Sequence, residues 1–352
     1  MDQRTLRVGF VGAGGNTRAK HIPNLKAIPG VVLTAVANRS RESGSVVATE
    51  FGVARVESDW SSVVEAQDID AVVIGTWPYL HAEVTIAALR AGKHVLTEAR
   101  MARDAAEAAR MLEESRKHPA LVAQIVPSPF SLDVDSTVAG ILGRGLIGPV
   151  REVILTHTFA GVADSAARQT WRQDFELSGF NTLTLGIYYE IAQRWLRCDP
   201  DSIIADAAVH TTSRPAFAGD GAAEIRIPDS VTFSGRYAAG LAGFAPGARI
   251  IGHFSGVERG QLRNEVRLNG ENGTLRFDVA RQELFLAIEG AEGPVDVPPQ
   301  ARRGWRVEED FVESIRTGAP VKLTDFASGL GYMRVTEAIW RSWSGGGARE
   351  TV

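Results

Sequence analysis

A glycine-rich turn near the N-terminus constrains the fold of this chain more than any other segment. Residues 6–11 (LRVGFV) are apolar and predict a buried strand, and the residues up to Ile28 have the spacing of a helix. In the turn between them, Gly12 permits a tight bend and Gly14 lets the backbone approach a pyrophosphate. The helix would present free amide groups and its positive dipole end to the same ligand. This order predicts a dinucleotide-binding fold, although Thr17 stands at the third glycine position of the GxGxxG pattern.

Strand and helix patterns continue to alternate up to residue 126. After residue 69 a buried strand, a loop, an amphipathic helix and a second apolar strand follow one another, with Gly92 as the helix stop. Further strands are expected at 31–38, 54–56 and 121–126, and further helices at 43–50, from Trp60, and at 104–117. Such alternation predicts a doubly wound parallel sheet of the Rossmann type, and we expect residues 1–126 to form this domain.

The pattern changes after Pro127. Segments such as VREVILTHTF, GARIIGHFSG and NEVRLNGENGTLRF alternate with period two, which predicts a large, mostly antiparallel open sheet. Helical spacing returns at 305–316 and 326–343. Because 352 residues are many for one core, we expect a second α/β domain at 127–352, whose C-terminal helices can pack back on the first. Several strands carry apolar residues on both faces, so a homodimer or homotetramer built on this sheet is expected.

Composition excludes several classes of function. A net charge of -4 gives no basic surface for nucleic acid. The single cysteine, Cys198, rules out an internal disulfide, and the 7 histidines are scattered without the spacing of metal ligands. The first residues lack a signal-peptide core and no apolar run approaches ~20 residues. We therefore expect a cytoplasmic enzyme with a small-molecule substrate, no metal, and no nucleic-acid or membrane partner.

Five segments occur in an order that resembles a known family. They are GFVGAGGN, TWPYLHAEVTIAALRAGKHVLTEA, TWRQDFELSGF, LGIYYEIAQRWL and NEVRLNGENGTLRF, and they span nearly the whole chain. This order resembles the Gfo/Idh/MocA family of nicotinamide-dependent oxidoreductases. The resemblance implies an N-terminal Rossmann domain, a C-terminal α/β domain whose open sheet is often used for oligomerisation, and substrates that are mostly sugars, polyols or related ketones.

The chain departs from this family at the positions that the resemblance marks as catalytic. The family's Glu-Lys-Pro reads Glu98, Ala99, Arg100, so the lysine is replaced by alanine. The family's aspartate and histidine, four residues apart on one helix, correspond to Thr184 and Tyr188. The family's asparagine and arginine after the sixth strand are absent from the loop VPSPF. These losses at one site indicate a changed reaction.

Tyr188 is the candidate that we predict to move a proton. Arg100 can hold an oxyanion, but its pKa above ~12 prevents it from donating a proton at neutral pH. A tyrosine can exchange a proton if its pKa falls from ~10 beside a cation, which Arg100 or a nicotinamide ring could provide. The alternative is that Tyr188 only packs at the pocket floor. Glu98 is predicted to contact the nicotinamide ribose or to support that contact.

The end of the second predicted strand favours NADP, with NAD as the alternative. Chains that bind NAD usually place an acidic residue there, whereas Asn38 is neutral and is followed by two arginines that can pair with a 2′-phosphate. The predicted cofactor site comprises Gly12, Gly14, Gly15, Asn16, Thr17, Asn38, Arg39, Ser40, Arg41, Thr76, Trp77, Pro78, His81 and Glu98. For His81 a capping role is favoured over catalysis, and His157 is interpreted as a histidine satisfied within a sheet.

Aromatic residues dominate the predicted substrate pocket, which suits sugar faces, glycosides or aromatic compounds. The predicted substrate contacts are Tyr79, Phe130, Trp171, Arg172, Asp174, Asn181 and Thr184, while Trp77, Phe180 and Tyr188 add aromatic walls. The segment TWRQD is equally well interpreted as a salt-bridged turn. Three functions remain open: an NADP(H)-dependent oxidoreductase acting on a carbohydrate-like alcohol or ketone, a redox-neutral lyase or glycoside-cleaving enzyme, and a non-catalytic cofactor-binding sensor.

Overall fold

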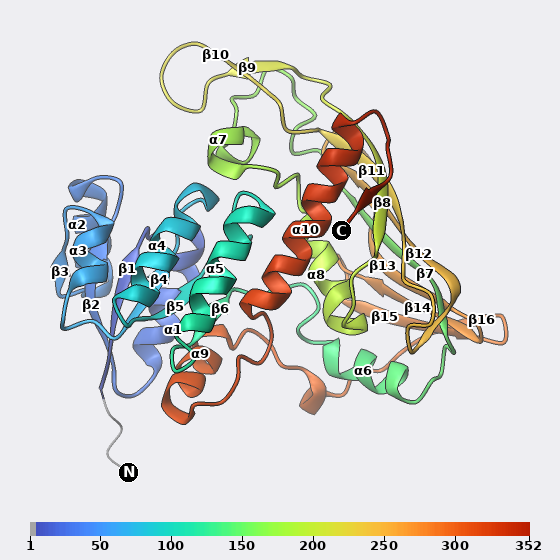
Figure 1. Ribbon diagram of the computed structural model, residues 1–352, viewed down its shortest axis with the longest axis horizontal. Helices are drawn as coiled ribbons and strands as arrows, with labels where there is room; N and C mark the ends of the chain where they lie inside the picture. Colours follow the sequence, from blue (N-terminus) through green and yellow to red (C-terminus); the bar gives the residue numbers. More distant parts are fainter. Residues whose placement is uncertain (1–4) are drawn as a thin grey trace. The chain divides into compact units, whose positions relative to one another are not determined.

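The computed structural model describes residues 5–352, which form two compact units (Figure 1). The first unit contains the chain up to Pro127 together with residues 306–330. The second contains residues 128–305 and 331–352. The first unit is therefore discontinuous in sequence.

The first unit is built on six parallel strands in the order β3-β2-β1-β4-β5-β6. The strands are β1 (Leu6–Val11), β2 (Val31–Ala37), β3 (Arg55–Val56), β4 (Ala71–Ile74), β5 (His94–Thr97) and β6 (Ala123–Ile125). Strand β4 is apolar throughout and wholly buried, as expected where helices cover both faces. The strand order reverses beside β1, which opens a crevice at the carboxyl ends of β1 and β4. The predicted Rossmann sheet is thereby confirmed.

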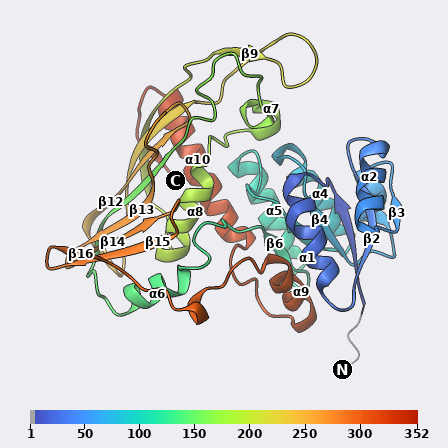
Figure 2. The ribbon, with the colours of Figure 1, turned by 180° about the vertical axis from the view of Figure 1, so that it is seen from behind.

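Helices cover both faces of this sheet (Figures 1 and 2). One layer consists of α3 (Trp60–Glu65), α4 (Pro78–Arg90) and α5 (Ala105–Lys117), which contact one another in that order. The other face carries α1 (Ile22–Ala27), which follows the π-helical turn η1 (Thr17–His21), as well as α2 (Arg41–Phe51) and α9 (Val307–Thr317). Ser40, Asp59 and Asp104 begin α2, α3 and α5, and each accepts a backbone N–H of the first turn.

The segment 306–330 completes the first unit at the edge of β6. The amide of Ile125 donates to the carbonyl of Thr324 over 2.9 Å, and Gln124 pairs with Asp325 as an isolated β-bridge. The side chain of Gln124 also donates to the carbonyl of Val307 over 3.1 Å. These contacts tie a late segment of the chain to an early strand.

The second unit contains a nine-stranded sheet in the order β16-β15-β14-β13-β7-β12-β11-β8-β17. Its strands are β7 (Val150–Thr158), β8 (Ser202–Ala208), β11 (Ser230–Arg236), β12 (Phe244–Ser255), β13 (Asn264–Gly270), β14 (Gly273–Asp278), β15 (Glu283–Ile288), β16 (Ala291–Pro294) and β17 (Glu350–Thr351). Only β7 and β12 pair in parallel among these neighbours. A small sheet pairs β9 (Ser213–Pro215) with β10 (Ala222–Glu224). The predicted large, mostly antiparallel sheet is confirmed.

One face of the nine-stranded sheet is covered by helices (Figure 1). These are α6 (Asp135–Gly143), α8 (Leu185–Leu196) and the part of α10 (Phe326–Ser344) that lies in this unit. The short helix α7 (Phe175–Ser178) follows the 3₁₀ turn η2 (Trp171–Gln173). A further 3₁₀ turn, η3, spans Pro299–Ala301. On the covered face Leu155 and Ile250 are fully buried. On the open face their neighbours Ile154 and Ile251 are half-buried.

No helix within residues 5–352 has the length and apolar character needed to cross a membrane.

Candidate functional site

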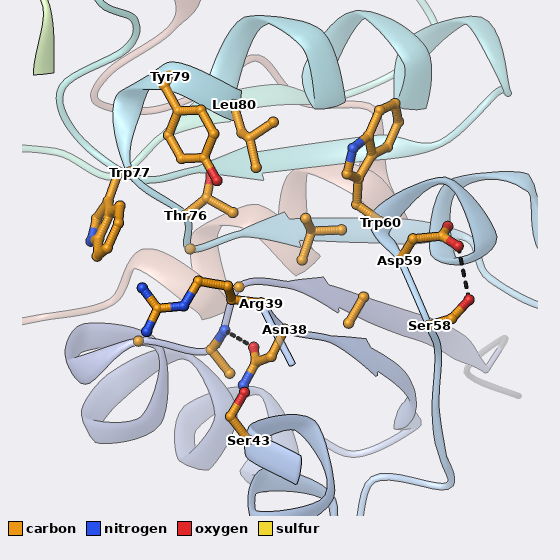
Figure 3. Close-up of a pocket in the computed structure, with 16 residues that line it drawn as sticks. Asn38, Arg39, Ser43, Ser58, Asp59, Trp60, Thr76, Trp77, Tyr79 and Leu80 are labelled. Carbon is orange, nitrogen blue, oxygen red and sulfur yellow. Dashed lines mark hydrogen bonds between the residues drawn. The ribbon is translucent and has the colours of Figure 1, made fainter. Parts of the chain in front are cut away.

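A cavity of about 410 Å³ lies in the first unit, at the crevice that the strand order predicts (Figure 3). The loops that follow β1, β2, β3 and β4 line it. Because the carboxyl ends of parallel strands meet at one edge of the sheet, four loops distant in sequence converge there. The glycine turn, Asn38 and Arg39 all lie in this cavity, as predicted for a dinucleotide site.

The glycine turn is shaped by close contact with the loop after β4. Gly12 has a φ of +78°, and a Cβ added to it would lie 2.8 Å from the amide nitrogen of Thr76. A Cβ on Gly75 would lie 2.0 Å from Oγ1 of Thr17. At Gly15, by contrast, an added Cβ would meet nothing within 4 Å. The turn is therefore packed tightly on its protein side and open toward a ligand.

Thr17 and His81 support the loops and have almost no exposed surface. Thr17 is 1% exposed and its hydroxyl donates to the carbonyl of Gly12 over 3.4 Å. The two ring nitrogens of His81 lie 3.0 Å from the carbonyl oxygens of Thr76 and Arg100, which ties the loop after β4 to the loop after β5. Burial lowers the pKa of His81 despite these carbonyls. The predicted capping role of His81 is wrong, because α4 has Trp77 at its N-cap and His81 is wholly buried.

Asn38 occupies the position at which an acidic residue would contact a ribose. Its Oδ1 accepts a hydrogen bond of 2.7 Å from the amide of Ala13, so the end of β2 is fixed to the glycine turn (Figure 3). The guanidinium of Arg39 lies 5.7 Å from the centre of the Trp77 ring, at a cation–π distance. Ser40 is the N-cap of α2 and Arg41 is its first residue.

The loops after β3 and β4 add aromatic walls to this cavity. Trp77 and Tyr79 are 6.5 Å apart between ring centres, and Tyr79 is 37% exposed. Tyr79 was expected to contact the substrate, but its side chain lies in the same cavity as the glycine turn (Figure 3). Asp59 and Trp60 also line the cavity and were not predicted. The signal was present, because Ser58-Asp-Trp-Ser-Ser follows a parallel strand and Asp59 caps the next helix.

A buried ionic cluster lies beside the glycine turn. The ring of His21 places Nε2 2.9 Å from Glu98 Oε1 and Nδ1 2.5 Å from Glu308 Oε1. The amide of Asn16 donates to Glu98 over 2.5 Å, and that of Asn24 donates to Glu308 over 2.9 Å. Each carboxylate in the cluster therefore has an amide donor besides the imidazole.

The electrostatics of this cluster favour a protonated imidazole. Burial favours the neutral ring, but the hydrogen bonds that His21 donates to Glu308 and Glu98 outweigh it and raise the pKa of His21 to about 9. The pKa of Glu98 is lowered although burial opposes this, chiefly because His21 donates to it. Neither His21 nor Glu308 was predicted from the sequence. Two residues 287 positions apart give no local signal.

Arg100 follows Glu98 and Ala99 on the loop after β5. It is only 5% exposed, which is unusual for an arginine. Its carbonyl oxygen is the one that His81 contacts. The loop after β5, which contains Ala99 at the position of the family's lysine, is thus fixed by two contacts. His21 contacts Glu98, and His81 contacts the carbonyl oxygen of Arg100.

In the second unit Tyr188 lies on α8 and faces β7. Its hydroxyl is 2.9 Å from Nδ1 of His157, and the two ring centres are 4.5 Å apart. Phe130 and Phe254 pack against Tyr188 with ring centres 5.5 and 6.0 Å away. Burial and, to a lesser extent, Asp278 raise the pKa of Tyr188 well above its ordinary value. The lowering that a nearby cation would bring stays a prediction. His157 is a partner of the candidate tyrosine as well as a sheet residue.

Thr184 and Asn181 precede Tyr188 in the chain, Thr184 at the start of α8 and Asn181 in the loop before it, so the helix predicted to carry all three begins too late to include Asn181. Thr184 is the N-cap of α8 without a side-chain capping bond, and its Oγ1 is buried and has no hydrogen-bond partner among the described residues. A buried hydroxyl of this kind can serve a bound ligand or water. Asn181 is 1% exposed and its amide donates to the carbonyl of Ser178 over 2.7 Å.

The segment around Trp171 forms a capped turn. Asp174 begins α7 and accepts the amides of Glu176 and Leu177 at 2.9 and 3.3 Å. The guanidinium of Arg172 lies 4.3 Å from the centre of the Trp171 ring. Asp174 therefore has a structural task, while Trp171 and Arg172 form a stacked pair.

Two family models match this chain. The model described as "Oxidoreductase family, NAD-binding Rossmann fold" matches residues 6–125, and the model of the "GFO/IDH/MocA C-terminal domain" matches residues 136–276. The chain belongs to the Gfo/Idh/MocA oxidoreductase family. The resemblance inferred from the sequence is confirmed.

Relatives within the Gfo/Idh/MocA family match this chain to different extents. The dTDP-3,4-didehydro-2,6-dideoxy-alpha-D-glucose 3-reductase of Streptomyces violaceoruber is 35% identical over 189 residues, which are 53% of this chain and 52% of that protein. The chain thus spans about half the length of this relative. An uncharacterized oxidoreductase of Rhizobium meliloti is 26% identical over 96% of both chains. Among solved structures, levoglucosan dehydrogenase in its apo form superposes with a TM-score of 0.86 at 22% identity over 99% of both chains, which shows the same fold.

Proposed function

We propose that this Gfo/Idh/MocA protein is an NADP(H)-dependent oxidoreductase that interconverts an alcohol and a ketone on a carbohydrate-like substrate. The observation that carries the proposal is the cavity of the first unit, with its open glycine turn beside Asn38 and Arg39. Relatives named as sugar reductases and a levoglucosan dehydrogenase support the substrate class. The first unit would bind the nucleotide and the second unit the substrate.

The residues of the cavity fit a dinucleotide. The amides that follow Gly14 would take the pyrophosphate, and the Trp77 and Tyr79 rings would flank the adenosine half. Asn38 offers an N–H donor where an acidic residue would repel a 2′-phosphate, and Arg39 and Arg41 supply positive charge. When bound, the nicotinamide gives or accepts a hydride. Asn16 and Glu98, held by His21, would contact its ribose.

Tyr188 would give a proton to the substrate oxygen during reduction and remove it during oxidation. Arg100 would steady charge on that oxygen without exchanging a proton. The unpartnered hydroxyl of Thr184, together with Asn181, Phe130, Trp171 and Arg172, would bind the substrate. Asp174 would help by fixing the turn on which Trp171 and Arg172 lie.

A redox-neutral reaction is the second candidate, and the observation that favours it is Ala99 at the lysine position. Such an enzyme oxidises its substrate transiently, eliminates or cleaves a bond, and returns the hydride. A cofactor-binding sensor without turnover is the remaining alternative.

The proposal is tested by incubating the protein with NADP⁺ or NAD⁺ and a panel of polyols, anhydrosugars and glycosides. Net formation of reduced nicotinamide, seen by its absorbance, supports the dehydrogenase. Product detected by mass spectrometry without a lasting change in the cofactor would support the redox-neutral reaction. Cofactor binding with neither result across the panel would favour the sensor.

A further inference from the structure

We propose that His157 is the proton relay behind Tyr188, taking the phenolic proton during substrate oxidation and returning it during reduction. This inference rests on the proposed function, since it presumes that Tyr188 exchanges a proton with the substrate. His157 acts through Tyr188 and is therefore a positioning residue for the reaction.

The contact between the two side chains is direct. Nδ1 of His157 lies 2.9 Å from the Tyr188 hydroxyl, within ordinary hydrogen-bond distance. The rings are 4.5 Å apart between centres, and Phe159 and Phe130 flank the pair at 5.1 Å from His157 and 5.5 Å from Tyr188. In such apolar surroundings a hydrogen bond is strengthened, and a proton leaving the phenol has a defined acceptor.

The opposite strand carries a buried polar group: Oδ1 of Asn264 has no hydrogen-bond partner among the described residues. Asn264 on β13 is paired with His157 on β7, so the two side chains share one face of the sheet. Burial lowers the pKa of His157, while the Asn264 side chain favours the protonated ring. A neutral imidazole with its proton on Nε2 leaves Nδ1 free to accept from Tyr188, and the imidazolium formed later has Asn264 beside it.

The relay removes the need for a phenolate. Tyr188 is 2% exposed, and Asp278 on β14 adds to the burial that disfavours its ionised form. A phenol that receives one proton while it passes another to His157 stays neutral throughout. The pair thus performs base catalysis that a buried tyrosine alone performs poorly.

The step balances as follows in the direction of oxidation. The substrate O–H bond breaks and its proton goes to Oη of Tyr188, whose own proton goes to Nδ1 of His157. A bound oxidised nicotinamide would take the hydride from the breaking C–H bond, and the electron pair of the O–H bond would form the C=O bond. His157 then holds one extra proton, which it releases to water. Reduction runs through the same steps in reverse.

The first test reads the ring nitrogens of His157 by NMR, using ¹⁵N-histidine-labelled protein with NADPH added and no substrate. The His157→Asn variant identifies the signal. We expect a neutral ring at pH 7 with the proton on Nε2, and protonation of Nδ1 as the pH falls. A neutral ring with its proton on Nδ1 would overturn the relay, since that nitrogen would donate to Tyr188 and could not accept.

The second test is kinetic and uses the panel compound that reduces NADP⁺ fastest. Asparagine carries an amide close to the position of Nδ1 but cannot take a proton. His157→Asn should therefore lower kcat about 10- to 100-fold with little change in KM, and should abolish the rise of kcat with pH on the acid side. The matched control is His253→Asn on β12, whose side chain lies on the open face of the same sheet and should leave kcat and its pH profile unchanged.

The outcomes separate the relay from the function on which it rests. Unchanged kcat and pH profile in His157→Asn, with a large loss in Tyr188→Phe, would refute the relay alone. Full turnover in Tyr188→Phe would refute the relay and the proton transfer by Tyr188, while the oxidoreductase activity would stand. Failure of every panel compound to reduce NADP⁺ or NAD⁺ would refute the proposed function itself. Bound NADPH and an unchanged melting temperature in His157→Asn exclude misfolding as the cause of a loss.

Discussion

The side-chain oxygen of Asn38 accepts a hydrogen bond of 2.7 Å from the amide of Ala13, so the residue at the end of β2 fixes the glycine turn after β1. This bond orients the Asn38 amide. Its oxygen is committed to the protein, which leaves the NH₂ group as the end that can face a nucleotide.

The orientation of Asn38 predicts a preference for NADP(H). Arg39→Ala should weaken NADPH binding by ~10- to 100-fold, the scale of one charge-assisted hydrogen bond, and should change NADH binding little. Asn38→Asp keeps the acceptor for Ala13 and replaces the NH₂ group by a carboxylate oxygen, so it should shift the preference toward NADH. Calorimetric titration with both cofactors measures this. Tighter binding of NADH by the unmodified protein contradicts the assignment.

Tyr188→Phe should lower turnover about 100-fold or more while cofactor affinity stays near that of the unmodified protein. Ala99→Lys should not restore the lost activity, because the histidine and aspartate that accompany the family's lysine are absent. Steady-state kinetics together with NADPH titration checks both statements. Rescue by Ala99→Lys would show that the position of the lysine, and not Tyr188, decides the reaction.

His21 should stabilise the fold in a pH-dependent way. Folding raises its pKa from 6.5 to about 9, so protonation favours the folded protein. This contribution, roughly 3 kcal/mol, is complete below pH 6.5 and is lost as the pH rises through about 9. Thermal unfolding of His21→Gln should show a lower melting temperature than that of the unmodified protein. The difference between the two melting temperatures, the gap, should narrow as the pH rises from 6.5 through about 9. His210→Gln, at an exposed position of the second unit, serves as control, and a gap independent of pH would disprove the ion-pair account.

Gly75 should tolerate no side chain. A Cβ there would lie 2.2 Å from the carbonyl oxygen of Gly12, so Gly75→Ala must push the two loops apart. We expect a loss of NADPH affinity by ~10-fold or more and a drop in melting temperature. Gly140→Ala, at an open helical position, should instead stabilise by ~0.5–1 kcal/mol. Equal behaviour of the two variants would argue against the loop contact.

The open face of the nine-stranded sheet is where we expect a second copy to bind. Ile154 and Ile251 are neighbours there, half-buried, next to the ion pair of Arg249 and Glu152. Light scattering at micromolar concentration should give the mass of two or four chains, and Ile251→Asp should reduce it. A monomer in the unmodified protein removes this prediction.

Periodic features of the sequence predicted the fold well. The strand at 6–11, the turn after it and the alternation up to residue 126 identify a parallel sheet because each depends on neighbours only a few residues away. The same holds for Gly12 and Asn38, whose places follow from the ends of their strands.

The candidate site could be predicted only in part. The sequence indicated Glu98 but not His21, the histidine that contacts it. His21 could not be recognised because its second partner, Glu308, meets it only through the tertiary fold. It indicated Tyr188 but not the direction of its pKa, which depends on burial against β7. Tyr79 was predicted to contact the substrate, and its place beside the glycine turn depends on the first turn of α4, which decides which way a side chain points.

The hydrogen bonds from Ile125 to Thr324 and from Gln124 to Val307 have a consequence for synthesis on the ribosome. When the last strand of the nucleotide-binding sheet has been made, its edge is unpaired and His21 faces only one of its two carboxylates. The sheet can be completed only after residues 128–305 of the second unit and the segment up to Asp325 have been translated. A fragment ending at Pro127 would expose this edge permanently, and we expect it to aggregate where the full chain does not.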